Sequence, residues 1–192
     1  MGGAGAIGGD GAIGGEGLAR LRELLRAEGG LMATLLAPEG NGVGRPQDAA
    51  SPAVLAAAGP RAAGRRGEYE LLIEAIYEGY LLHYGTPRVV RVAEADLGLL
   101  AGDQLYAIGL ARLVALGDTA AVAELADTIT LSALSQGAGC KELAGAVWTA
   151  GARAVGWGPS EAHRWAKDLL LAGAPEAIEA MRTSARAPAG AA

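Results

Sequence analysis

Apolar positions recur every three to four residues from residue 68 to residue 186, a spacing that predicts helices throughout this stretch. Glycine and proline residues divide the pattern and mark the expected helix ends. No segment alternates apolar and polar residues with a period of two, so strands are not expected. The sequence therefore predicts an all-α helical bundle, with helices over residues 68–84, 89–116, 119–136, 141–155, 159–172 and 175–186.

The stretch 89–116 is apolar almost all round, which is typical of a helix at the centre of a bundle. Several of its large side chains recur every seven residues and would form one stripe. An apolar stripe left uncovered would exceed what soluble monomers usually expose. We therefore expect a homodimer, or a stable complex with another protein, through the side chains of Val92, Leu99, Tyr106 and Leu113.

The first 67 residues differ from the rest in composition. Residues 1–15 repeat a glycine-rich hexamer and predict a disordered tail, because glycine loses much backbone entropy on ordering. Residues 16–37 contain a short amphipathic helix that could dock on a partner or on the domain itself. Residues 38–67 are rich in proline and glycine and predict a linker. The helical domain is expected at 68–186, followed by a disordered tail at 187–192.

Composition narrows the function classes. The chain has 192 residues, 51% of them hydrophobic, with no phenylalanine and a net charge of −5. This charge does not favour a nucleic-acid surface. One cysteine excludes an internal disulfide framework, and neither a secretory signal nor an uninterrupted transmembrane stretch is recognisable. We expect a cytoplasmic protein, and the bias toward alanine, glycine and arginine is typical of a GC-rich bacterial genome.

Acidic residues provide the first candidate chemistry. Glu70, Glu74 and Glu78 are spaced by four residues and share a helix face, as either a solvated stripe or a cation site. Asp103 lies within the most apolar helix, so an ionised carboxylate there either binds a helix end or an arginine such as Arg88 or Arg91, or faces a cavity. His83 and His163 do not form a metal-binding pair by spacing, and no metal site is predicted from them.

The order of three segments resembles the trans-polyprenyl diphosphate synthase family. These segments are Glu74-Ala75-Ile76-Tyr77-Glu78, then Gly85-Thr86-Pro87, and then the Gly102-Asp103 helix from Leu99 to Ala107. The resemblance implies part of the isoprenoid synthase fold and dimerisation through central helices. It also implies magnesium-dependent prenyl transfer, with Glu74 and Glu78 as catalytic carboxylates. Ligand binding is then expected at Glu74, Glu78, Asp103 and Lys141.

The chain departs from that family at the positions that carry its chemistry. Ala75 stands where a carboxylate is expected, His83-Tyr84 replaces an arginine pair, and the second aspartate-rich motif is absent. The sequence therefore favours a non-catalytic helical subunit that acts as a protein-interaction, scaffold or regulatory component, without a cofactor. One alternative is a magnesium-dependent prenyltransferase using Glu74 and Glu78. The other is a scaffold that binds an apolar, isoprenoid- or quinone-like ligand.

Overall fold

The computed structural model describes residues 13–38 and 51–186, and all regular secondary structure in these residues is helical. The prediction of an all-α fold is confirmed. The predicted tails at 1–12 and 187–192, and residues 39–50 of the predicted linker, lie outside the described residues. The helices are α1 Ile13–Glu28, α2 Gly30–Thr34, α3 Pro52–Ala57, α4 Arg66–Tyr84, α5 Ala95–Ala115, α6 Thr119–Gly137, α7 Lys141–Trp157, α8 Glu161–Leu171 and α9 Ala177–Arg186, with a 3-10 turn at Pro60–Ala62.

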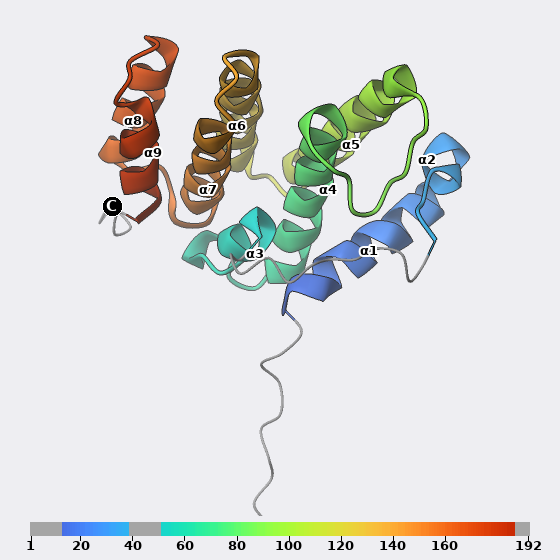
Figure 1. The fold of residues 1–192 in the computed structure, drawn as a ribbon. Helices are drawn as coiled ribbons and strands as arrows, with labels where there is room; N and C mark the ends of the chain where they lie inside the picture. Colours follow the sequence, from blue (N-terminus) through green and yellow to red (C-terminus); the bar gives the residue numbers. More distant parts are fainter. Residues whose placement is uncertain (1–12, 39–50, 187–192) are drawn as a thin grey trace, which may run out of the picture.

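The longer helices follow one another as neighbouring pairs (Figure 1). The ribbon runs from α1 and α2 at one end, through α4 with α5 and α6 with α7, to α8 with α9 at the other. Helix α3 lies across the base and packs against both α4 and α7. The amphipathic helix α1 buries Leu21 and Leu25 against the domain, so it docks internally.

Helix α4 occupies the centre, and the prediction that the 89–116 stretch is the central buried helix is wrong. Helix α4 contacts α1, α3 and α5, and it buries both its apolar and its acidic side chains. Helix α5 packs through one face on α4, while Leu99, Leu100 and Val114 are exposed. Among the described helices, α5 alone is long and apolar enough to cross a membrane, a property that core helices of soluble proteins share.

Part of the predicted linker is a packed helix. Ser51 caps α3 by accepting hydrogen bonds from the backbone amides of Ala53 and Val54, and Pro52 follows in the first turn. The alanines of α3 are buried between α4 and α7. The linker prediction is therefore wrong for residues 51–67, because small residues that resemble a linker in composition here allow helices to approach closely.

Helices α3 and α7 approach each other closely at Gly156. A Cβ atom placed there would lie 2.5 Å from the carbonyl oxygen of Ala56, which is backbone and cannot rotate away. The sequence places helix ends correctly at Gly117 and Gly173, where φ is +78° and +68°. Residues with a Cβ rarely adopt this left-handed conformation, and glycine therefore ends these helices.

Candidate functional site

The predicted site carboxylates, Glu74 and Glu78, are fully buried at the centre of the fold. Both side chains lie on α4 with no exposed surface, and Glu70 on the same face is also buried. Of the two alternatives for this acidic face, the solvated stripe is therefore wrong. A buried carboxylate requires a partner, because transfer from water strongly disfavours its charged form.

Arg88 is the shared partner of the two carboxylates. Its Nη2 atom lies 2.5 Å from Glu74 Oε2, and its Nε atom lies 3.2 Å from Glu78 Oε2. The guanidinium also lies over the ring of Tyr77, 5.1 Å from the centroid. Burial lowers the pKa of Arg88, but the attraction of Glu74 and Glu78 outweighs it and leaves the pKa above its usual value. Arg88 is therefore a permanent cation between two carboxylates.

Backbone amides complete the environment of Glu78. Its Oε1 atom accepts hydrogen bonds from the amides of Arg88 and Val89, both at 2.6 Å, and from Val90 at 3.1 Å. The same segment pairs with the chain after α2, where Ala37 donates to the Val89 carbonyl oxygen at 2.9 Å. This binding holds residues 88–90 out of a helix, and α5 therefore begins at Ala95 rather than at residue 89.

The remaining carboxylate oxygens bind donors from the N-terminal part of the chain. Ser51 Oγ donates to Glu74 Oε1 at 2.7 Å, and the amide of Gly17 donates to Glu70 Oε1 at 3.2 Å. Burial is the main cause that raises the pKa of Glu70. The three glutamates thus fasten α1, α3 and the segment before α5 onto α4. Among the described residues, no group of three or more His, Cys, Asp or Glu side chains could hold a metal ion.

The other predicted ligand residues do not join this cluster. The side chain of Asp103 is 68% exposed, so the expectation of a buried carboxylate is wrong. Its Oδ1 atom lies 3.2 Å from His83 Nε2 rather than beside Arg88. Lys141 is exposed at the first position of α7. The structure brings Glu74 and Glu78 together through Arg88 and leaves Asp103 and Lys141 at the surface.

The predicted contact stripe does not lie on one surface. Leu113 is fully buried in the core, so its assignment to an interface is wrong. Val92 and Tyr106 are half-buried against core clusters, and only Leu99 is exposed. The exposed face of α5 instead contains Leu99 together with Leu100, Ala107 and Val114.

Aromatic side chains fill the junction between α4 and α7. The rings of Tyr77 and Trp148 meet edge to face, with 4.9 Å between their centroids. The centroid of the Tyr80 ring lies 5.1 Å from that of Trp148. Tyr80 also accepts a hydrogen bond from Gln136 Nε2 at 2.6 Å. These side chains contact one another and contribute to the core.

Two clusters were missed by sequence reasoning. Arg88 was expected, like Arg91, as one possible partner of Asp103, although its position just after a proline turn could have indicated a return toward α4. His163 and Lys167, four residues apart on α8, face Glu124 and Asp127, which are three residues apart on α6. That matching of opposite charges at helical spacing was the available signal.

Comparisons with family models, with curated proteins and with solved structures found no match to this chain.

Proposed function

We propose that the chain is a non-catalytic helical subunit that acts by binding protein, with the exposed face of α5 as its contact surface. The observation that carries this proposal is the exposure of Leu100, at 64%, together with Leu99 and Val114 on one helix. Large apolar side chains grouped on a folded surface mark interaction sites more often than isolated ones do. The resemblance to polyprenyl diphosphate synthases adds support, because it implies dimerisation through central helices.

A second copy of the chain is the occupant that this face fits best. Leu100 and Val114 each lie seven residues from Ala107, two helical turns away in opposite directions. Two α5 helices packed antiparallel about Ala107 would therefore place Leu100 of each copy against Val114 of the other.

The buried state of the glutamates supports the non-catalytic part of the proposal. Prenyl transfer would require Glu74 and Glu78 to hold magnesium on a diphosphate. Their oxygens instead bind Arg88, Ser51 and backbone amides. A metal ion would have to displace a partly buried arginine that forms two ion pairs.

Molar mass in solution tests the contact surface. We expect the full chain to be a dimer at micromolar concentration by light scattering, and Leu100→Arg to be a monomer with an unchanged circular dichroism spectrum. Leu171→Arg on α8 is the matched control, because Leu171 is equally exposed on a different helix. A wild-type monomer, or equal effects of the two substitutions, would overturn self-association through α5.

A separate assay tests the catalytic alternative. The purified chain, incubated with magnesium, isopentenyl diphosphate and an allylic diphosphate, should not form a prenyl diphosphate of greater chain length. Product that requires magnesium and is lost in a folded Glu74→Gln, Glu78→Gln double variant would establish the prenyltransferase instead.

A further inference from the structure

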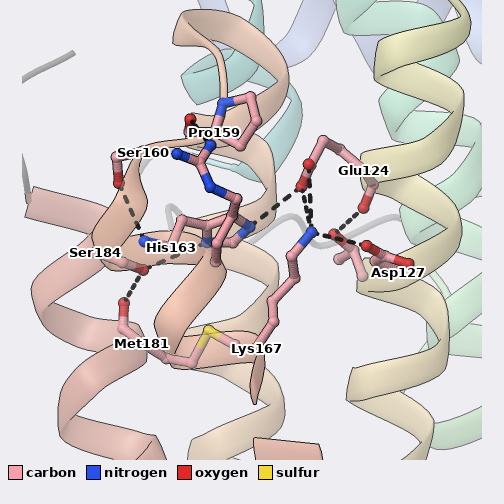
Figure 2. Close-up of polar contacts among 10 residues, drawn as sticks. Glu124, Asp127, Pro159, Ser160, His163, Lys167, Met181 and Ser184 are labelled. Carbon is pink, nitrogen blue, oxygen red and sulfur yellow. Dashed lines mark hydrogen bonds and ion pairs between the residues drawn. The ribbon is translucent and has the colours of Figure 1, made fainter. Parts of the chain in front are cut away.

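Helices α6, α8 and α9 meet at a buried histidine (Figure 2). His163 lies on α8 and is 4% exposed. Its Nε2 atom is 3.2 Å from Glu124 Oε2 on α6, and its Nδ1 atom is 3.4 Å from Ser184 Oγ on α9. The imidazole thus contacts both neighbouring helices at once, one through each ring nitrogen.

Both ring nitrogens of His163 face acceptors. The hydroxyl of Ser184 donates its proton to the carbonyl oxygen of Met181 at 2.9 Å, so its oxygen is left to accept from Nδ1. On the other side, Glu124 can only accept while it is ionised. Burial raises the pKa of Glu124, but hydrogen bonds from His163 and Lys167 outweigh this and hold the pKa below its usual value. Only the doubly protonated imidazolium donates to both partners.

The charges around the ring lead to the same protonation state. Lys167 Nζ binds Glu124 Oε2 at 3.1 Å and Asp127 Oδ2 at 2.7 Å, so one lysine serves two carboxylates. Burial lowers the pKa of Lys167, and the hydrogen bond to Asp127 with the attraction of Glu124 raises it above its usual value. Helix α9 contributes the Ser184 hydroxyl, while its Arg182 binds Glu142, and Arg164 on α8 donates to the Pro159 carbonyl oxygen. The cluster is neutral only when His163 is charged.

We propose that His163 is a proton-linked clamp that holds the α8–α9 hairpin on α6. The clamp is tight while the imidazole carries its second proton and loosens as pH rises through the range in which imidazoles lose it. Loss of that proton removes one of the two donated hydrogen bonds and leaves an uncompensated negative charge beside a buried ring. The hairpin covers Leu131 and Val147, so loosening would give water access to the core cluster beneath it.

Hydrogen exchange of the full chain tests this clamp. Exchange of α8 and α9 amides, corrected for intrinsic rates, measures local opening of the hairpin. We expect opening of the hairpin to increase about tenfold between about pH 5.5 and pH 8, because loss of one buried hydrogen bond weakens the closed state by about that factor. His163→Gln should abolish the pH dependence of hairpin opening. The control variant His83→Gln replaces the chain's other histidine and should retain that pH dependence. Equal opening at both pH values in the wild type would overturn the proposal.

The protonation state can also be read directly, without depending on a variant that folds. Nitrogen-15 NMR distinguishes the imidazolium from each neutral tautomer, and His83→Gln assigns the signals of His163. We expect protons on both Nδ1 and Nε2 of His163 at about pH 6, and loss of one as the amides of α8 begin to open. A neutral imidazole throughout this range would show that the clamp does not exist.

Discussion

Arg88 Nη2 lies 2.5 Å from Glu74 Oε2, and this contact joins the segment before α5 to the buried centre of α4. The same guanidinium reaches Glu78 Oε2 at 3.2 Å. One cation therefore bridges two carboxylates one helical turn apart, and backbone amides supply the remaining donors to Glu78. The cluster is a structural joint between segments that are distant in the sequence.

Removal of that cation should destabilise the fold strongly. We predict that Arg88→Met lowers the free energy of unfolding by about 3–5 kcal/mol, because two buried carboxylates lose their charged partner. Urea denaturation followed by circular dichroism measures the loss. Arg91→Ala is the matched control at an exposed position, and should change stability by less than about 0.5 kcal/mol.

The cause of that loss can be separated from lost packing. Addition of Glu74→Gln and Glu78→Gln to Arg88→Met removes the uncompensated charges while it keeps the side-chain volume. We expect the triple variant to be more stable than Arg88→Met alone. If the two were equally unstable, the arginine would act through its packing on Tyr77 rather than through charge.

The contact between α3 and α7 makes a second prediction. Gly156→Ala should destabilise the protein by about 1–3 kcal/mol, because the new methyl group meets the carbonyl oxygen of Ala56. Gly145→Ala on the same helix is the control. No heavy atom lies within 4 Å of the added Cβ there, so alanine should raise stability by up to about 1 kcal/mol. Thermal melts of the two variants should therefore shift in opposite directions, and parallel shifts would contradict this account of α3.

The sequence predicts the helices well where periodicity and end signals agree. Asp118 caps α6 through its side chain, and Gly117 and Gly173 end helices as expected. These features depend on neighbours within a few residues, so the local pattern contains them. Helix α3 was missed because its alanine-rich sequence has little apolar periodicity, and its burial depends on the glycine in α7 that receives it.

The candidate site was harder to predict because its partners are distant or belong to the backbone. Glu78 resembles a solvated residue of a charged stripe, and nothing near it in sequence shows that three amides of residues 88–90 bind its carboxylate. Asp103 resembles a buried residue because its helix is apolar all round, yet α5 turns that face outward. Helical patterning identifies a face, whereas tertiary packing decides what covers it.

The cap of α6 makes a prediction about pH. Asp118 Oδ2 accepts a hydrogen bond from the Tyr69 hydroxyl at 2.5 Å, and Oδ1 accepts from Arg61 Nη2 at 2.8 Å and from the Ala121 amide at 2.9 Å. Burial raises the pKa of Asp118, but the hydrogen bond from Tyr69 and the other donors outweigh it, and the pKa lies below its usual value. The folded state therefore favours the ionised carboxylate.

A carboxylate with a lowered pKa stabilises the fold above its unfolded pKa, and this contribution is lost as pH falls through its folded pKa. Asp118→Asn keeps an oxygen that can cap α6 but removes the charge, and should cost about 1–2 kcal/mol of unfolding free energy at pH 7. The difference between wild type and variant should narrow below about pH 4, as the wild-type carboxyl takes up a proton. Urea denaturation at several pH values measures this convergence, with Asp168→Asn at an exposed position of α8 as the control. A difference that stays constant down to about pH 3 would mean that Asp118 acts through hydrogen-bond geometry alone, and that its charge adds nothing to the joint between α4 and α6.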